Sequence, residues 1–298
     1  MTNVNKTLYI PLYGKSFVSK KGIILNDEKA EEIWSKVKEE VGNDLKGKSK
    51  SKYLAYYMGM RAAIFDNWIN EKINDYLNKN NNDSSSPDNI VIHLGCGMDS
   101  RCERISRVNR KDDSSLFSSP KITWFDVDFP EVIEERKKYY SESEYCRMIS
   151  ADARQPDWIS ALPNFQNAII IMEGISMYLT LQEIQNLFQA FSAKFPHINL
   201  LLDCYTTFAA KASRIRNPIN DVGVTIVHGI DDPKLLEENA TSSNNTDTSL
   251  PRISFIREHE ITPSNLTSQL HGIEKYIFKS VYAGSLSKKM YRLYEFEK

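Results

Sequence analysis

The chain has 298 residues, of which 41% are hydrophobic and 26% are charged, and its formal net charge is −1. This balance is ordinary for a globular protein and excludes a wholly disordered chain, a collagen and a disulfide scaffold. A protein this close to neutrality lacks the basic field of a dedicated nucleic-acid binder, so we expect no nucleic-acid partner.

The sequence carries no feature of a membrane-spanning or secreted protein. No apolar run approaches the roughly 18–20 residues of a membrane span, and residues 1–20 contain no continuous apolar segment of the secretory type. The histidines form no H-E-x-x-H motif and the cysteines form no C-x-x-C pair. Because these spacings match no metal site, we expect no metal. From the absence of an apolar run we expect no membrane partner. We also expect a cytoplasmic protein with reduced thiols.

The first 80 residues carry helical patterns. Residues 27–41 are rich in Glu, Lys and Ala. Within residues 52–77, apolar side chains recur at steps of three or four, at Tyr53, Tyr57, Met60, Ile64 and Trp68. These positions share one helix face. We therefore predict a helical arm before the first strand.

Strands and helices alternate from residue 90 onward. Largely apolar or β-branched runs predict strands at residues 90–94, 122–128, 145–150, 168–172 and 199–203. Between these runs, Ser100 with Glu103 and Thr180 with Glu183 form capping boxes that open helices. This alternation predicts a parallel sheet with right-handed crossovers.

The last part of the chain has a different pattern. Residues 275–283 and 290–296 have the composition of two strands, so we expect an antiparallel hairpin there. With the preceding strands this predicts an α/β fold: a doubly wound, Rossmann-like sheet of seven strands, mostly parallel. Residues 204–252 exceed a simple connection and predict a cap insertion. Polar runs predict exposed loops at residues 78–89, 112–120 and 239–251.

A turn of Gly95, Cys96 and Gly97 follows the first predicted strand. Glycine at such a turn lets a ligand approach the backbone closely. The third glycine of the G-x-G-x-x-G dinucleotide motif is absent, because Ser100 holds its position. A plain tight turn explains the same residues, so the turn alone does not establish a ligand site.

Acidic residues follow the next strands at their carboxyl ends, where open α/β sheets bind ligands. Asp126 and Asp128 stand two residues apart, so we expect both to face the crevice and to accept hydrogen bonds from ribose hydroxyls. Asp152 follows the third strand, where it can bind the amine of adenine, and Glu173-Gly174 follows the fourth, where the carboxylate can pair with a positive ligand group. The alternatives are solvated carboxylates or, for Asp152, a helix N-cap.

Three sequence blocks together resemble a known family. They are G-C-G-M-D-S-R at residues 95–101, F-D-V-D-F-P-E at residues 125–131 and E-G-I-S-M-Y-L at residues 173–179. In this order they resemble the leucine carboxyl methyltransferase family, which includes protein phosphatase methyltransferases and bacterial polyketide O-methyltransferases. The helical arm is similar to the family's R-x-x-x-x-D helix through Arg61 and Asp66, in a spacing closer to the bacterial type.

The resemblance implies a class I methyltransferase that uses S-adenosylmethionine. Carried over by position, it assigns the cofactor contacts to Arg61, Gly95, Gly97, Asp126, Asp128, Asp152, Ala153, Glu173 and Gly174. In this assignment Arg61 binds the methionine carboxylate, which suits a planar guanidinium, and Asp128 holds the ribose. It also implies a single domain, with residues 1–80 as the arm, 90–203 as the cofactor-binding core, 204–252 as the cap and 253–298 as the end of the sheet.

The methyl acceptor stays open at this level, as does the oligomeric state. Tyr178 and Tyr205 are candidates to face the acceptor, although core or loop packing explains either one. A carboxylate acceptor, on a small molecule or a protein C-terminus, is already ionised, whereas a hydroxyl acceptor needs a general base. Since the sequence offers no convincing base, it mildly favours a carboxylate.

Three functions remain as hypotheses. The first is an S-adenosylmethionine-dependent O-methyltransferase acting on a carboxylate or hydroxyl. The second, a nicotinamide-dependent oxidoreductase, would use the same turn and strand-end acid, but the missing third glycine and the terminal hairpin argue against it. The third is a non-catalytic regulatory protein that keeps the cofactor fold.

Overall fold

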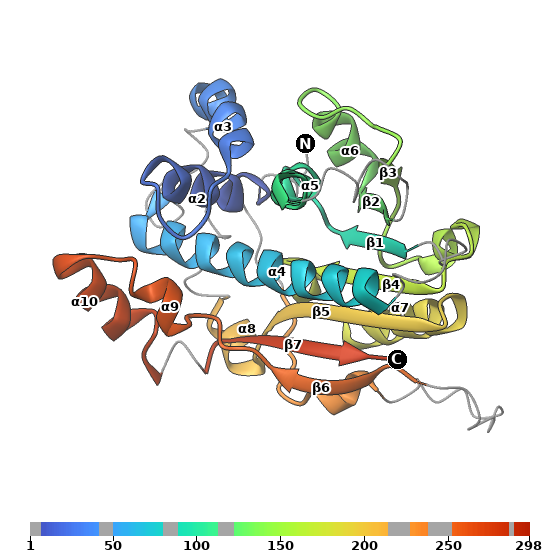
Figure 1. Ribbon diagram of the computed structural model, residues 1–298. Coiled ribbons are helices and arrows are strands. Elements are labelled where there is room, and N and C mark those ends of the chain that lie inside the picture. The colour runs from blue at the N-terminus through green and yellow to red at the C-terminus, as the bar shows by residue number, and fades with distance from the viewer. Residues whose placement is uncertain are drawn as a thin grey trace.

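The structure is a computed structural model in which residues 7–41, 50–79, 89–112, 122–213, 227–237, 252–285 and 289–298 are described. A seven-stranded sheet runs through it in the order β3-β2-β1-β4-β5-β7-β6, with helices on both faces (Figure 1). The polar runs for which we expect loops lie almost wholly outside these described residues.

The sheet is mixed. Its parallel strands are β1 (Asn89–Leu94), β2 (Ile122–Asp128), β3 (Cys146–Ser150), β4 (Asn167–Met172) and β5 (His197–Tyr205). Two antiparallel strands complete it, β6 (Ser254–Glu258) and β7 (Tyr291–Glu297), with β7 between β5 and β6. The predicted α/β class and the mostly parallel sheet of seven strands are confirmed.

Alternate residues of the strands supply the two apolar layers. Val91 packs on one face with α4 (Lys52–Lys79) and α5 (Arg101–Asp112). Ile90 and Ile92 pack on the other face with α7 (Leu181–Lys194) and the short helix η2 (Pro156–Ala161). A buried parallel strand is covered on both faces, which explains its nearly continuous apolar run. The capping box that opens α7 is present, since the backbone N–H of Glu183 donates to Thr180.

The arm consists of α2 (Tyr9–Lys20), α3 (Glu28–Val41) and α4. The sequence did not predict α2, because several of its buried positions are small or polar, among them Gly14, Lys15 and Ser19. These positions are buried because α2 lies directly on α4: a Cβ at Gly14 would come within 2.8 Å of Met58. No helix in the described part of the chain is long and apolar enough to cross a membrane.

Shorter helices complete the described chain. They are α6 (Pro130–Arg136), η3 (Ser176–Tyr178), α8 (Thr207–Ser213), η5 (Pro233–Leu236), α9 (Ser264–Thr267) and α10 (Gly272–Val281). Of the expected cap insertion, the structure describes α8, η5 and a bridge between Tyr205 and Gly229. The remainder of that segment lies outside the described residues.

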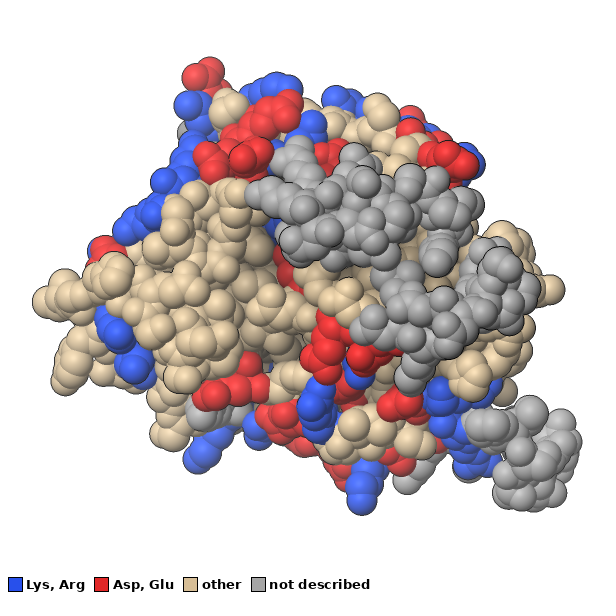
Figure 2. Space-filling view, viewed as in Figure 1, with Lys and Arg blue, Asp and Glu red and all other residues tan. Residues whose placement is uncertain are grey.

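The predicted hairpin at the end of the chain is wrong in its first strand. Residues 275–283 lie mostly in α10, and the partner of β7 is β6. Phe278 and Tyr282 stack at 5.4 Å one helical turn apart, whereas β6 is a largely exposed edge strand with little apolar signal. Ile273, Tyr276 and Val281 of α10 are exposed, and Figure 2 shows few charged side chains over this part of the surface.

Candidate functional site

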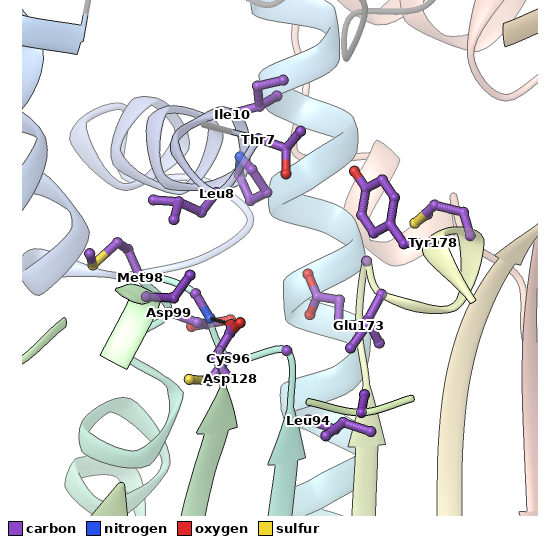
Figure 3. A pocket seen from close by; sticks show the side chains of 18 of the residues that line it. Thr7, Leu8, Ile10, Leu94, Cys96, Met98, Asp99, Asp128, Glu173 and Tyr178 are labelled. Atoms are coloured by element: carbon purple, nitrogen blue, oxygen red, sulfur yellow. Dashed lines mark hydrogen bonds between the residues drawn. The ribbon is translucent and has the colours of Figure 1, made fainter. Parts of the chain in front are cut away.

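A cavity of about 1150 Å³ lies at the carboxyl ends of the parallel strands. Its lining extends from Ser150 at the end of β3 to Tyr291 at the start of β7. Because β2 and β4 lie on opposite sides of β1, the strand order reverses here, and open α/β sheets bind ligands at that point. Figure 3 shows Thr7 and Leu8 of the N-terminal segment facing the strand ends across the cavity.

The glycine turn forms the floor of the cavity. The backbone N–H of Gly95 donates to Val127 O at 2.8 Å, which ties the turn to β2. Gly97 has a φ of 49°, a left-handed conformation that favours glycine. A Cβ on Gly97 would lie 3.4 Å from Leu8, so the arm closes directly onto the turn. Both glycines line the cavity, as the resemblance implies.

Asp128 ends β2 at the edge of the cavity. Its Oδ2 accepts the backbone N–H of Gly97 at 2.8 Å, and its Oδ1 accepts that of Phe129 at 2.8 Å. Burial raises the pKa of Asp128, although these two backbone donors lower it. A carboxylate has about four acceptor sites, so this side chain retains capacity for a ligand's hydroxyl groups.

Asp126 does not line the cavity, contrary to the expectation that both acids face the crevice. It lies opposite His93 of β1, two residues before the end of β2, and is fully buried. Its carboxylate accepts from Trp124 Nε1 at 2.9 Å and from Arg136 at 2.5 Å. Although Asp126 and Asp128 lie on the same face of the strand, the deeper carboxylate is thus occupied by protein donors. His93 Nδ1 also bonds to Asp126 Oδ1 at 3.2 Å.

Asp152 and Ala153 line the same cavity beyond β3. The Asp152 carboxylate accepts from the backbone N–H of Arg154 and from its guanidinium, at distances of 2.6–3.0 Å. The side-chain hydrogen bond from Arg154 lowers the pKa of Asp152. Asp152 therefore remains ionised at neutral pH beside the apolar surface of Ala153.

Arg61 and Glu173 form a buried pair in the middle of the cavity wall. Arg61 of α4 donates from Nε to Glu173 Oε1 at 3.0 Å, and Arg101 bonds to the other carboxylate oxygen. Burial opposes ionisation of Glu173, but the charges of Arg101 and Arg61 outweigh it and lower the pKa of Glu173 to about 2. This ion pair thus joins the arm, which carries Arg61, to the end of β4, which carries Glu173.

Asp203 and Tyr291 extend this pair toward β5 and β7. Asp203 Oδ1 accepts the backbone N–H of Gly174 at 2.7 Å, and its Oδ2 accepts Arg61 Nη1 at 3.0 Å and the Tyr291 hydroxyl. Tyr291 Oη also accepts from Arg61 Nη1 at 2.7 Å. Gly174 has a φ of 73°, and a Cβ there would lie 3.3 Å from Arg61 Nη2. Glycine therefore lets the guanidinium lie directly over the backbone.

These groups belong to a larger buried ion-pair network that connects the arm, the glycine turn and the strand ends. Its cations are Lys15, Arg61, Arg101 and Arg104, and its carboxylates are Asp27, Asp66, Asp99, Glu173 and Asp203. Among the described residues, four cations face five carboxylates, so this part of the network carries one negative charge in excess when all are ionised. A buried excess charge is costly unless a ligand or a proton compensates it.

Sequence reasoning missed several of these residues. Lys15 lies on the unpredicted helix α2 and pairs with Asp99 Oδ2 at 2.9 Å, and both line the cavity. Asp203 ends a predicted strand, so the rule that selected Glu173 could have selected it. Tyr291 gave no comparable signal, because it lies 88 positions from Asp203 in the chain.

The cavity wall above β5 and β7 differs in character, and we call it the β5–β7 half. It is lined by Leu54, Tyr57, Met58, Met177, Tyr178, Tyr205, Ala209, Ser213, Tyr282, Met290 and Tyr291. These side chains are apolar or carry neutral hydroxyls. The lysine and arginines of the described lining, Lys15, Arg61 and Arg154, each pair with a carboxylate. The β5–β7 half therefore suits a neutral, aromatic or apolar ligand.

Tyr178 and Tyr205 both lie in this half. Tyr178 forms a side-chain hydrogen bond with Thr7, and Figure 3 shows the two residues facing each other above the cavity. Burial raises the pKa of Tyr178, so its phenol keeps its proton at neutral pH. Tyr205 stacks edge-on against Tyr291 at 5.3 Å. Both candidates thus line the β5–β7 half of the cavity.

Comparison with known proteins identifies the relationship. The sequence profile of leucine carboxyl methyltransferase matches residues 5–192, more than half of the chain. The chain belongs to the leucine carboxyl methyltransferase family. The resemblance seen in the sequence blocks is confirmed, and the protein is a methyltransferase with S-adenosylmethionine as cofactor.

Two curated proteins of similar sequence align with most of the chain. The tetracenomycin polyketide synthesis O-methyltransferase TcmP of Streptomyces glaucescens is 23% identical over 278 residues, which are 93% of this chain and 90% of TcmP. The S-adenosyl-L-methionine-dependent methyltransferase dpfgK of Gibberella zeae is 22% identical over 254 residues, 80% of this chain and 78% of that protein. A solved S-adenosylmethionine-dependent methyltransferase from Mesorhizobium loti has a TM-score of 0.44 at 12% identity, covering 78% of this chain and 98% of that one.

The cavity can be tested against the cofactor of this methyltransferase. S-adenosylmethionine presents ribose hydroxyls, an amino acid and a positively charged sulfonium. Asp128 has free acceptor capacity in the lining, and the buried network has one negative charge in excess, which complements a sulfonium. The glycine at position 97 gives the ligand close access to the backbone. The residues present therefore fit the cofactor.

The described side chains also show whether the protein could hold a metal ion. In the described part of the chain no group of three or more His, Cys, Asp or Glu side chains could hold a metal ion. Cys96, inside the glycine turn, is buried, and burial raises the pKa of its thiol. Its small size in a tight turn accounts for its presence there.

Proposed function

We propose that this methyltransferase transfers the methyl group to a hydroxyl oxygen of a small, neutral, aromatic molecule held in the β5–β7 half of the cavity. The supporting observation is the lining of that half, in which tyrosines and methionines dominate and every described lysine or arginine of the cavity wall is already paired. The similarity to TcmP, an O-methyltransferase of polyketide synthesis, is in line with this proposal.

A hydroxyl acceptor agrees with this lining better than the carboxylate that the sequence mildly favoured. A carboxylate buried against apolar side chains needs a positive partner, since an unpaired buried charge is strongly disfavoured. The β5–β7 half offers tyrosine hydroxyls instead, which form hydrogen bonds with neutral oxygen groups. Aromatic side chains such as Tyr57 and Tyr205 also stack on planar rings.

We propose the following roles for the residues around the cofactor. Asp128 accepts hydrogen bonds from the ribose, Asp152 and Ala153 border the adenine, and Gly95 and Gly97 let the cofactor pass close to the backbone. Arg61 presents Nη2 above Gly174 to the methionine carboxylate, while Glu173 faces the amino group. The cofactor supplies a methyl group that is already activated on a cationic sulfur.

Rate acceleration in this proposal comes mainly from alignment. Arg61 and Glu173 fix the amino-acid end, and the tyrosines of the β5–β7 half fix the acceptor oxygen. Holding two reactants in line can account for roughly 7–11 kcal/mol of a reaction barrier. Leu8 and Thr7 cover the cavity from the arm side, which keeps water from the reacting atoms.

We further propose that the chain acts as a single domain with the boundaries given by the sequence, namely arm, core, cap and end of the sheet. The contact of Thr7 with Tyr178 and the pairing of Arg61 with Glu173 support one unit, because they join arm and core. The four buried, unpaired cysteines are in keeping with a reducing compartment such as the cytoplasm.

A matched pair of acceptors tests the proposal. The purified protein is incubated with S-adenosylmethionine and either 1-naphthol or 1-naphthoic acid, which share a ring system and differ in the acceptor group. Mass spectrometry measures the methyl ether or the methyl ester. We expect the ether to form and the ester to stay at background. Formation of the ester alone would contradict a hydroxyl acceptor.

A further inference from the structure

Tyr291 connects the cavity to a buried carboxylate. Its hydroxyl donates to Asp203 Oδ2 and accepts from Arg61 Nη1 at 2.7 Å. Asp203 is fully buried and does not line the cavity, whereas Tyr291 does. A phenol oxygen has two acceptor sites, so one remains for a hydroxyl group of a ligand.

We propose that Tyr291 and Asp203 form a proton relay that deprotonates the acceptor hydroxyl during methyl transfer. This inference rests on the proposed function, because an ionised carboxylate acceptor has no proton to give up. It supplies the general base that the sequence lacks, in the half of the cavity where the acceptor binds. Asp203 is the final proton acceptor, and Tyr291 passes the proton on without becoming a phenolate.

The step balances in atoms and charge. As the bond between the acceptor oxygen and the methyl carbon forms, the acceptor's O–H proton moves to Tyr291 Oη and the phenolic proton moves to Asp203 Oδ2. The electron pair of the broken bond between carbon and sulfur stays on sulfur. The products are a neutral ether, a neutral thioether and a neutral carboxylic acid.

The charges of the buried network favour this balance. With one carboxylate in excess, the network is neutral overall when a sulfonium is bound beside it. Methyl transfer removes the sulfonium charge, and a proton on Asp203 removes one carboxylate charge at the same time. The buried site thus holds no uncompensated charge before or after the reaction, which matters because such a charge is costly in the interior.

The surroundings of Asp203 also prepare it to accept a proton. Burial raises the pKa of this carboxyl, against the charge of Arg61, and the nearby Glu173 raises it further. Glu173, paired with two arginines, stays ionised. Two carboxylates with such different environments can divide the tasks, one holding the cofactor and one receiving the proton.

The relay is tested with Tyr291→Phe and Asp203→Asn, using 1-naphthol as acceptor. We expect kcat to fall by about 100-fold in each variant, the usual contribution of general-base catalysis, with a much smaller change in KM. We expect kcat of the native protein to fall toward acid pH as Asp203 takes up a proton, and we expect this fall to disappear in Tyr291→Phe. Calorimetry with S-adenosylhomocysteine should give unchanged affinity for Tyr291→Phe. Tyr294→Phe is the matched control, because Tyr294 lies on the same strand and bonds to the Asp231 carbonyl away from the cavity.

A second measurement needs no acceptor. Infrared difference spectra of the native protein against Asp203→Asn, with S-adenosylhomocysteine bound, follow the protonation of this carboxyl with pH. We expect Asp203 to keep its proton at pH values above the ordinary pKa range of aspartic acid. A carboxyl that takes up its proton only at pH values below that range would overturn the relay. A native kcat and a native pH profile in both variants would overturn it as well. Methylation of 1-naphthoic acid but not of 1-naphthol would instead overturn the proposed function, and the relay with it.

Discussion

Asp128 and Gly97 are joined by a hydrogen bond of 2.8 Å, from the backbone N–H of the turn to the carboxylate at the end of β2. The bond holds the carboxylate in the lining of the cavity, and further acceptor sites of this carboxylate remain for a ligand. It also couples the two sequence blocks, G-C-G and V-D-F-P, on which the family resemblance depends. Changes at either residue should therefore act on cofactor binding.

Asp128→Asn should weaken the binding of S-adenosylhomocysteine by about tenfold to hundredfold, because hydrogen bonds to a charged group contribute roughly 1.5–3 kcal/mol. Burial raises the pKa of Asp128, and ribose donors favour the ionised form. Affinity of the native protein should thus fall as the pH drops through this raised pKa. Isothermal titration calorimetry across pH measures both effects. Asp157→Asn, at an exposed position outside the cavity, should bind like the native protein.

Gly97→Ala and Gly22→Ala form a pair that separates backbone strain from ligand access. Both glycines have positive φ, of 49° and 65°, so each alanine should cost about 1–2 kcal/mol of stability. A Cβ at Gly97 would also meet Leu8 at 3.4 Å, whereas a Cβ at Gly22 would meet nothing within 4 Å. We expect only Gly97→Ala to lose cofactor affinity. Equal affinities in the two variants would contradict a cofactor path along the turn.

Glu173 should make the protein sensitive to acid. Although burial opposes ionisation, Arg101 and Arg61 lower the pKa of Glu173 to about 2, below its ordinary value of 4.5. A carboxyl whose pKa is lower in the folded state stabilises the protein above its unfolded pKa, and this contribution is lost as the pH falls from 4.5 to about 2. Urea unfolding across this window should show the loss. Glu173→Gln should be less stable at neutral pH but should show a shallower decline.

Arg61→Lys should keep the positive charge and lose the forked geometry that reaches Glu173, Asp203 and Tyr291 together. We expect a loss of stability of about 3 kcal/mol, as when a buried pair is broken, and weaker binding of S-adenosylhomocysteine. Arg257→Lys is the control, since Arg257 lies on the edge strand β6, is half exposed and bonds to Glu295 of the neighbouring strand β7. Native cofactor affinity in Arg61→Lys would count against its role at the methionine carboxylate.

Sequence reasoning succeeded where a side chain's place follows from its own strand. The glycine turn, Asp128 and Glu173 each lie at the end of a strand with a clear apolar run. Their position at the edge of the sheet therefore follows from that strand alone. It failed where distant segments decide the outcome. Asp126 lies two residues deeper in the sheet than Asp128, and Arg136 donates a hydrogen bond to its carboxylate.

Other errors have the same cause. The apolar residues at positions 273–283 suit strand or helix equally, and the contact of Phe278 with Tyr56 of the arm is formed by the helix. Glu274 of the same helix also bonds to Tyr56 and Lys52, and no local sequence pattern predicts these contacts. The relay pair is a further case, because β7 brings Tyr291 to Asp203 from the end of the chain.

The most direct test of the account is a crystal structure of the protein with S-adenosylhomocysteine and 1-naphthol. We predict the ribose on Asp128, the amino acid between Arg61 and Glu173, and the naphthol in the β5–β7 half with its hydroxyl bonded to Tyr291. The sulfur should then lie in line with that hydroxyl oxygen. A cofactor whose sulfur points away from the β5–β7 half, or a naphthol bound elsewhere, would contradict the account.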